Sequence, residues 1–410
     1  MNRELKNDAL WIAKQAIEAV KPDAAVRRAL ENVELRGKVY LVSVGKAAWQ
    51  MANAAQKVLG GRIESGIVLT KYGHVQGEIE NVRCLEAGHP VPDENSYAGT
   101  RAVLELTGGL SEEDTVLFLL SGGGSALFEL PKIANDEMQD ITGQMLACGA
   151  QIQEMNTIRK RLSNVKGGRF AQWCAPAHVE SIVLSDVLGD PLDMIASGPA
   201  AADTTTAEQA AAIAEKYGLR LSETARRCLK EETPKELKNV RTQIIGSVRE
   251  LCRAAEAACA ALGYQTVFLT DLLSCEASEA GRMMAAILRS HAAEEGKLAF
   301  LMGGETVVHL KGNGLGGRNQ ELALAAAEGL DGLERAAVIS VGSDGTDGPT
   351  DAAGGYVDGF SASELERKGV RLSEALAQND AYHALAAIDA LVMTGPTGTN
   401  VNDVTIGLLR

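Results

Sequence analysis

The chain has 410 residues, of which 46% are apolar and 23% charged, and its formal net charge is -14. A chain of this length is too long for a single hydrophobic core and predicts two domains of ordinary size. The balanced composition excludes global disorder. The acidic balance, without any run rich in Lys and Arg, argues against nucleic acid and anionic membranes as partners.

The first predicted elements are a helix and then a strand that leads through a tight turn into a second helix. Apolar residues recur at helical spacing along residues 9–20, which predicts an amphipathic helix. The β-branched run at residues 38–44 (KVYLVSV) ends in Gly45 and Lys46 and opens a helical stretch. We therefore expect a buried strand whose end carries a lysine.

Five further apolar segments also end in loops of Gly, Ser, Thr or Asp. They are residues 115–120, 181–184, 298–302, 337–341 and 390–393. Near-continuous apolar strands are typical of a parallel sheet covered on both faces. In such sheets ligands bind outside the carboxyl ends of the strands. The glycine excess, 43 residues of 410 against a usual share of about 7%, thus falls where a ligand is expected.

A polar, helical stretch at residues 203–240 marks the predicted domain boundary, because Pro234 lies near its end. The run RTQIIGS (241–247) is expected to open a second series of strands, with helices at about 248–262 and 276–294. We predict one domain over residues 1–236 and a second over 241–410. The last 30 or so residues could pack on either domain, and a ligand cleft is expected between the two.

Two candidates for anion binding are Lys46 and the loop SGGGS. Lys46 stands between a buried strand and the start of a helix, where free N–H groups and an ammonium both favour phosphate or carboxylate. The loop comprises Ser121, Gly122, Gly123, Gly124 and Ser125, and its glycines let several N–H groups approach a ligand. The alternatives are that Lys46 is a solvated surface lysine and that SGGGS is a simple turn. The loop is neither a Walker A motif nor a nucleophile elbow.

Two loops contribute clustered aspartates. Asp186, Asp190 and Asp193 follow the strand at 181–184, where carboxylates can hold magnesium or accept a hydroxyl proton. The loop SDGTDGPTDAAGG at 343–355 is a candidate magnesium or substrate loop through three aspartates, Asp344, Asp347 and Asp351. Structural aspartates in turns and helix caps are the alternative for both loops.

The segment GNGLGG at residues 312–317 fits the dinucleotide fingerprint Gly-x-Gly-x-x-Gly. The possible strand before it, TVVHLK, is short and polar in part, and the acidic residue expected near position 337 is missing. NAD(P) binding is therefore the weaker interpretation. The stronger one is that the loop presents Arg318, whose planar guanidinium suits phosphate oxygens.

Taken together, these motifs resemble one family, the type II glycerate kinases or glycerate 2-kinases, some of which are labelled hydroxypyruvate reductases. The matching stretches run in order along most of the chain: SVGKAA (43–48), LLSGGGSALF (119–128), MNTIRKRLSNVKGGRFA (155–171), SDVLGDPLDMIASGPAAAD (185–203), MGGETVVHLKGNGLGGRNQE (302–321), SVGSDGTDGPTDAAGG (340–355) and TGPTGTNVND (394–403). Their joint occurrence is much more specific than any single motif.

The resemblance implies an α/β protein with a large Rossmann-like parallel-sheet N-terminal domain, a smaller α/β C-terminal domain of the MOFRL type and an active site in the cleft. It implies ATP-dependent phosphorylation of D-glycerate at the 2-hydroxyl, giving 2-phosphoglycerate and ADP, with Mg2+. Lys46, Asp190 and Arg318 are the expected catalytic residues, and the loops SGGGS and GGRN (316–319) are the expected cradles for the ATP phosphates. The expected substrate or nucleotide contacts are Gly45, Ser121, Gly122, Gly123, Gly124, Ser125, Asp186, Gly316, Gly317, Asn319, Thr397 and Asn400.

Two other functions stay open from the sequence: an NAD(P)H-dependent hydroxypyruvate reductase, and a non-catalytic small-molecule sensor. Seven cysteines without Cys-x-x-Cys argue against disulfides and zinc. The first residues lack a signal-peptide core, and no stretch reaches the roughly 18 apolar residues of a membrane span. We therefore expect a cytoplasmic enzyme that binds glycerate and a nucleotide, with a homodimer as one option for its assembly.

Overall fold

The computed structural model describes residues 2–31 and 33–410, and its contacts divide the chain into two units. One unit is Ala25–Ile245; the other joins residues 2–24 to Gly246–Arg410. This differs from the domains expected at 1–236 and 241–410, because the first helix belongs with the C-terminal half. No helix in the described part of the chain is both long and apolar enough to cross a membrane.

The unit Ala25–Ile245 is built on a six-stranded sheet in the order β3-β2-β1-β4-β5-β6. The four pairings from β3 to β5 are parallel. Its strands are β1 (Val39–Val44), β2 (Ile63–Lys71), β3 (Val82–Ala87), β4 (Thr115–Leu120), β5 (His178–Leu184) and β6 (Val240–Gly246). This is the doubly wound order of Rossmann folds, in which the chain direction across the sheet switches between β1 and β4.

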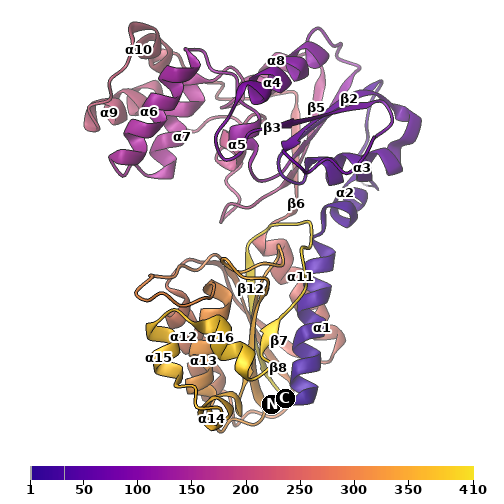
Figure 1. Ribbon diagram of the computed structural model, residues 1–410. Coiled ribbons are helices and arrows are strands. Elements are labelled where there is room, and N and C mark those ends of the chain that lie inside the picture. The colour runs from indigo at the N-terminus through magenta and orange to yellow at the C-terminus, as the bar shows by residue number, and fades with distance from the viewer. Residues whose placement is uncertain (1, 32) are drawn as a thin grey trace. The chain divides into compact units, whose positions relative to one another are not determined.

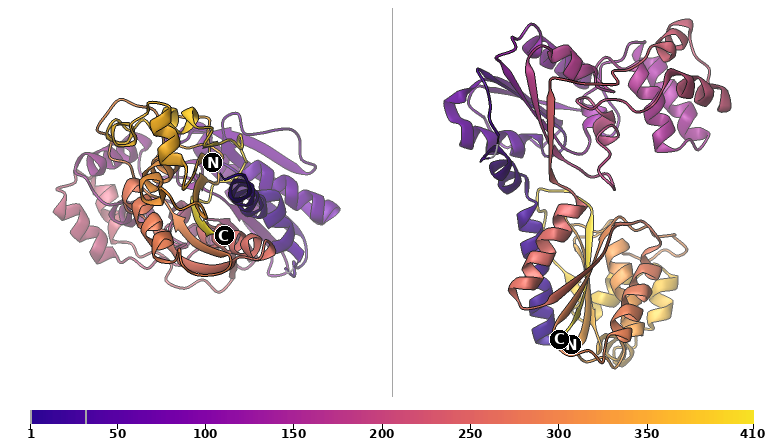
Figure 2. Two further views of the ribbon diagram at one scale, coloured as in Figure 1. Left: turned by 90° about the horizontal axis from the view of Figure 1, so that it is seen from below. Right: turned by 180° about the vertical axis from the view of Figure 1, so that it is seen from behind.

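Helices cover this sheet and form a separate bundle beside it (Figures 1 and 2). The helices α6, α7, α9 and α10 enclose their own apolar cluster, which includes Met138, Ile158 and Leu229. The helical elements are α2 (Pro22–Glu31), α3 (Ala48–Leu59), η1 (Gly60–Arg62), α4 (Glu94–Thr107), α5 (Gly124–Leu127), α6 (Asn135–Ala147), α7 (Ile152–Leu162), α8 (Arg169–Cys174), η2 (Ile195–Ser197), α9 (Ala207–Lys216) and α10 (Glu223–Lys230). The sheet and the bundle thus have distinct cores.

The second unit has a mixed sheet in the order β11-β10-β9-β12-β8-β7. Only the β7 and β8 pair is parallel; the other four pairings are antiparallel. Its strands are β7 (Gln265–Leu273), β8 (Leu298–Gly304), β9 (Ala336–Gly342), β10 (Gly354–Asp358), β11 (Leu391–Val392) and β12 (Asp403–Leu409). The expectation of parallel pairing fails here, because a strand buried on both faces is apolar in either direction.

Helices α1 and α11 lie on one side of this second sheet, and α12 and α13 on the other (Figure 1). The helical elements are α1 (Arg3–Ala19), α11 (Val248–Ala261), α12 (Ala277–Ser290), α13 (Arg318–Leu330), α14 (Ser361–Arg367), α15 (Leu372–Ala377) and α16 (Ala381–Ala387). The last residues form β12 in the middle of the sheet. The run 241–247 does not open this unit, because β6 is the edge of the first sheet.

Candidate active site

The carboxyl ends of β1 and β4 bring Lys46 and the glycine loop together at the switch point of the first sheet. The Lys46 N–H donates to the Gly122 carbonyl at 2.9 Å, and the Ala47 N–H donates to the Ser121 hydroxyl at 3.1 Å. The Ser121 N–H in turn donates to the Val44 carbonyl at 2.9 Å. These bonds fix the two loops against each other, as ligand-binding edges of such sheets require.

The glycines of this edge are needed because neighbouring groups lie where a side chain would be. A Cβ on Gly45 would stand 2.2 Å from the Ser121 Oγ, and one on Gly122 would stand 2.0 Å from the Asp186 Oδ2. Within the described residues, the N–H groups of Gly122, Gly123 and Gly124 donate no hydrogen bond. Free amides in a tight loop are the donors that an anionic ligand needs.

Lys46 has a half-buried side chain beside this loop. A Cβ on Gly123, whose φ is +88°, would stand 3.1 Å from the Lys46 Cγ. Across residues 2–31 and 33–410, the Lys46 ammonium has neither an ion pair nor a hydrogen bond. An unpaired lysine whose side chain passes a loop with free amides can neutralise a phosphate or carboxylate.

Asp190 provides an unpartnered carboxylate oxygen in the loop after β5. Its φ is +53°, a left-handed backbone that Asp tolerates better than most residues. Its Oδ1 is one of six buried side-chain polar atoms in the described residues that lack a hydrogen-bond partner. Leaving such an atom unpaired costs about 1–3 kcal/mol of stability. Unpaired buried polar atoms and left-handed backbone at a non-glycine residue are both typical of functional positions.

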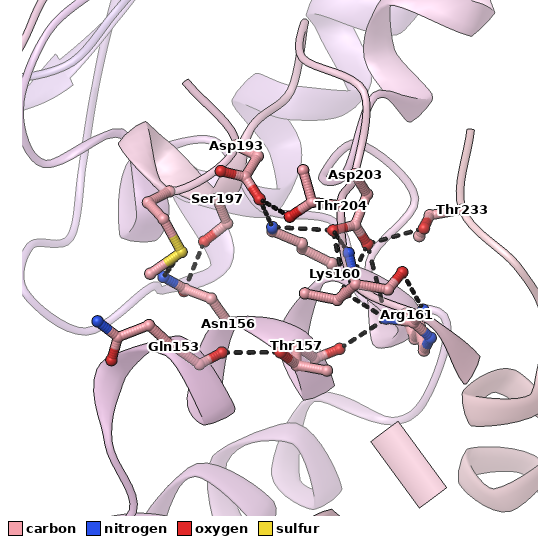
Figure 3. Close-up of polar contacts among 12 residues, drawn as sticks. Gln153, Asn156, Thr157, Lys160, Arg161, Asp193, Ser197, Asp203, Thr204 and Thr233 are labelled. Carbon is pink, nitrogen blue, oxygen red and sulfur yellow. Dashed lines mark hydrogen bonds and ion pairs between the residues drawn. The ribbon is translucent and has the colours of Figure 1, made fainter. Parts of the chain in front are cut away.

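A buried network anchors the same loop to helix α7 (Figure 3). The Lys160 ammonium, fully buried, donates to the Asp193 Oδ2 at 2.9 Å and the Asp203 Oδ1 at 3.0 Å. Burial opposes ionisation of Asp203, but hydrogen bonds from Thr205 and Thr233 and the charge of Lys160 hold its pKa below the ordinary value. The loop that carries Asp190 is therefore fixed three residues further on, at Asp193.

Replacing Lys160 with methionine is expected to lower the free energy of unfolding by about 3–5 kcal/mol, because Asp193 and Asp203 would lose their buried counter-ion. Urea denaturation followed by circular dichroism measures this change. The matched control is Lys132→Met, which removes a more exposed pair with Glu231 and should cost less than about 1 kcal/mol. Equal effects of the two substitutions would contradict the role of Lys160.

In the second unit, Arg318 begins α13 and is held by two carboxylates. Its Nε and Nη2 donate to the two Asp403 oxygens at 2.5 and 3.0 Å, and Nη1 donates to Glu305 Oε1 at 3.1 Å. Burial opposes its charge, but these partners raise the pKa of Arg318 above its usual value. Among the described residues, two of its five N–H groups remain unused, and they could contact an anion.

The segment GNGLGG packs against protein groups instead of framing a ligand. Its backbone N–H groups donate to residues 378–380: Gly312 to the Asn379 Oδ1, Gly314 to the Gln378 carbonyl and Leu315 to the Asp380 Oδ1. The N–H of the preceding residue, Lys311, also donates to the Asn379 Oδ1. The residues before it form no strand beyond an isolated bridge at Val307. The dinucleotide fingerprint therefore lacks its structural context.

Asp347 occupies the N-terminus of α13, where a phosphate was expected. Its carboxylate accepts the N–H groups of Asn319 at 3.2 Å and Gln320 at 2.8 Å. A Cβ on Gly317 would stand 2.3 Å from the Asp347 Cγ, and Gly316 packs on Ala381. The Asn319 side chain is itself buried and bonded to Ser340. The loop GGRN thus binds Asp347, which explains its glycines without a nucleotide.

Burial raises the pKa of Asp347 from 3.8 to about 6, with the negative Asp403 adding to the shift and the bonded N–H groups opposing it. Since the folded pKa exceeds the unfolded one, this group stabilises the fold fully below about pH 4, and that stabilisation is lost as the pH rises to about 6. We expect the unfolding free energy of the wild type minus that of Asp347→Asn to fall by on the order of 3 kcal/mol between pH 4 and 6. Denaturation curves at several pH values test this, and a difference that stays level or rises would refute it.

The three aspartates proposed as metal ligands do not gather. Asp344 accepts the Thr346 N–H at 3.0 Å, Asp351 accepts the Tyr382 hydroxyl at 2.8 Å, and Asp347 caps α13. No group of three or more His, Cys, Asp or Glu residues that could hold a metal lies within the residues that the structure describes. This corrects the expected triad: turn and cap geometry explains each carboxylate separately.

The other predicted contacts fall in two places. Ser125 follows the glycine loop, with its Oγ 3.4 Å from the Ser197 Oγ. Thr397 donates to the Ser343 carbonyl at 2.5 Å, and the Asn400 side chain accepts the Asn402 N–H at 3.3 Å. Thr397 and Asn400 therefore shape the turn before β12 in the second unit.

Sequence reasoning gave no role to His89, whose ring lies beside Gly123, or to Lys160, which anchors the loop of Asp190. His89 follows β3, whose sequence VRCLEA is only partly buried and gives no clear strand signal. Lys160 stands in a charged run at 159–161, which resembles a solvated helix surface. For Lys160 the usable signal is its position in the stretch 155–171, which resembles the glycerate 2-kinases.

Comparison with known proteins identifies the family. The model of a family described as a domain of unknown function (DUF4147) matches residues 8–230, and that of the MOFRL family matches residues 298–403. The chain is 53% identical over 411 residues to D-glycerate 2-kinase of Thermotoga maritima, covering 99% of this chain and 98% of that protein. It is 40% identical over 408 residues to a putative hydroxypyruvate reductase of Agrobacterium vitis, covering 95% and 91%.

A solved structure gives the same result. The crystal structure of glycerate kinase from Thermotoga maritima matches with a TM-score of 0.96 at 52% sequence identity, covering 100% of both chains. Sequence and structure agree along the whole chain, and the chain belongs to the glycerate 2-kinase family.

Proposed function

We propose that the chain transfers the terminal phosphoryl group of ATP to the 2-hydroxyl of D-glycerate, giving 2-phosphoglycerate and ADP. Family membership supports the reaction class. The observation that carries the proposal is an unpaired lysine, Lys46, whose side chain passes Gly123 in a loop with free amides at Gly122, Gly123 and Gly124, at the switch point of a Rossmann-type sheet. This arrangement provides the donors that a phosphate group requires.

In this proposal the phosphates lie on the SGGGS loop. Its N–H groups and Lys46 compensate negative charge on the transferring group, so the barrier falls mainly through positioning and electrostatics. The SGGGS loop is preferred over GGRN as the cradle, because Asp347 already accepts the Asn319 N–H of GGRN and the adjoining Gln320 N–H. Arg318 belongs to the second unit, where Asp403 fixes its orientation, and its two unused N–H groups are proposed to bind an anionic group of a substrate.

Asp190 is the proposed acceptor of the substrate proton. The oxygen of the 2-hydroxyl forms a bond to the terminal phosphorus, the bond from phosphorus to the ADP oxygen breaks, and the hydroxyl proton passes to the Asp190 carboxylate. Its Oδ1 has no partner within the described residues, so it is available for this proton. The bonds from Lys160 and Thr204 to Asp193 restrain the same loop.

Asp186 is the carboxylate that best fits a magnesium ion at the phosphates. Its Oδ2 lies against Gly122 in the phosphate-binding loop, and Mg2+ commonly takes one or two carboxylates together with substrate phosphates. When bound, the ion supplies positive charge that offsets the charge of the phosphate oxygens. Asp186 would then hold that ion near the loop.

The test follows the product. Purified protein is incubated with D-glycerate and Mg-ATP, and the product is examined by phosphorus NMR. Phosphate on C2 couples to one hydrogen and gives a doublet, whereas phosphate on C3 couples to two and gives a triplet. A doublet is expected. A triplet would contradict phosphorylation at C2. In a second assay with hydroxypyruvate and NADH, oxidation of NADH, together with no ADP formation from glycerate and Mg-ATP, would replace the kinase proposal with a reductase.

A further inference from the structure

His89 lies in the proposed phosphate site although it comes from a strand two positions away in the sheet. It follows β3, which is separated from β1 by β2. A Cβ built on Gly123 would stand 3.0 Å from the His89 Cδ2 and 3.1 Å from its Nε2, as well as 3.1 Å from the Lys46 Cγ. The imidazole edge that carries Nε2 and the Lys46 side chain therefore flank the same glycine.

The His89 ring also differs from the other histidines in its bonding. All six histidines lie in the described residues, and five have a ring nitrogen within hydrogen-bond distance of a partner: His74 with the Lys46 carbonyl, His178 with Glu180, His291 with Glu294, His309 with Glu276, and His383 with Asp380. In those same residues His89 has none, although its ring is partly buried. A desolvated ring without a partner is costly unless a ligand supplies one.

The surroundings of His89 favour a neutral ring facing an anion. Burial, and then the nearby charges of Lys46, Lys71 and His74, lower the pKa of His89 below its usual value. The closest carboxylate on its own loop, Asp93, is bonded to Tyr72 and Ser96. A neutral imidazole can donate one N–H to an anionic oxygen.

We propose that His89 is a ligand-contacting residue that donates its Nε2–H to the anionic oxygen bound by Lys46 and the Gly123 amide. The anion is either a phosphate of the nucleotide or the carboxylate of glycerate. Its identity rests on the proposed function, whereas the anion contact itself does not. Gln places an amide nitrogen near the position of Nε2, and Asn places one near Nδ1, so these two substitutions distinguish the ring atoms.

The direct test is an NMR titration of the histidine C2–H resonances of the full chain with inorganic phosphate, with His89 assigned by its absence in His89→Gln. We expect the His89 resonance to shift and the pKa of His89 to rise by about one unit on phosphate binding, because an anion favours the imidazolium. A resonance that stays fixed while phosphate binds would overturn the proposal. This readout remains valid even if the protein does not phosphorylate glycerate.

Kinetics then identify the anion. His89→Ala and His89→Asn should lose about 30- to 100-fold in kcat/KM while His89→Gln stays within about 5-fold of the wild type. A rise in KM for ATP assigns the oxygen to the nucleotide, and a rise in KM for glycerate assigns it to the carboxylate. His178→Gln is the control and should behave as the wild type. Unchanged kinetics in His89→Ala, or equal losses in all three variants with a lowered Tm, would show that His89 does not contact a ligand.

Discussion

Replacing Lys46 with methionine is expected to lower kcat for glycerate phosphorylation by about 10³-fold while leaving the fold intact. The loss follows because one preorganised donor to a developing charge contributes a factor of about 10²–10³, and Lys46 carries a full positive charge. Stability should be nearly unchanged, since the Lys46 ammonium pairs with no group in the described part of the chain. Steady-state kinetics and thermal denaturation measure the two quantities.

The matched control for this substitution is Lys57→Met, which removes an exposed lysine near the other end of α3. It should retain wild-type kcat and Tm. If Lys46→Met also retained wild-type kcat, the ammonium would have no part in phosphoryl transfer. If it unfolded the protein instead, its side chain would be structural.

Asp190→Asn should produce the second large loss, about 10²- to 10⁴-fold in kcat, because an amide cannot accept the substrate proton. The substitution suits the backbone, since Asn tolerates the φ of +53° at this position. It also leaves the volume unchanged, so the Tm should stay within a few degrees of the wild type. Rapid-quench measurements of a single turnover, with protein in excess, report the chemical step directly.

Asp193→Asn is the comparison for Asp190→Asn, because it lies in the same loop but contacts Lys160 and Thr204. We expect its main effect on stability, with kcat reduced much less than in Asp190→Asn. If the single-turnover rate of Asp190→Asn matched that of the wild type, another group would have to accept the proton.

The sequence predicted the first sheet well where strands are continuously apolar. Strands β4 and β5 lie where the runs at 115–120 and 181–184 placed them, because burial on both faces selects apolar residues throughout. Strand β3 was not predicted, because its side chains are only partly buried and its sequence is therefore not continuously apolar. With β3 missing, the loop that carries His89 had no position in the fold.

Partners that are distant in sequence could not be predicted. Nothing near Arg318 in the sequence indicates that Asp403, 85 residues further on, accepts hydrogen bonds from two of its three side-chain nitrogens. Likewise, Asp347 looked like a metal ligand because its loop has three aspartates, yet it caps a helix that begins at Arg318. Loop composition shows that carboxylates are present but not which N–H groups they accept.

The most direct test of the phosphate-site assignment is a crystal structure of the full chain with a non-hydrolysable ATP analogue and D-glycerate. Phosphate oxygens are expected within hydrogen-bond distance of the Gly122, Gly123 and Gly124 amides and of the Lys46 ammonium. Phosphates bound at the start of α13, with Asp347 displaced from the Asn319 and Gln320 N–H groups, would contradict it.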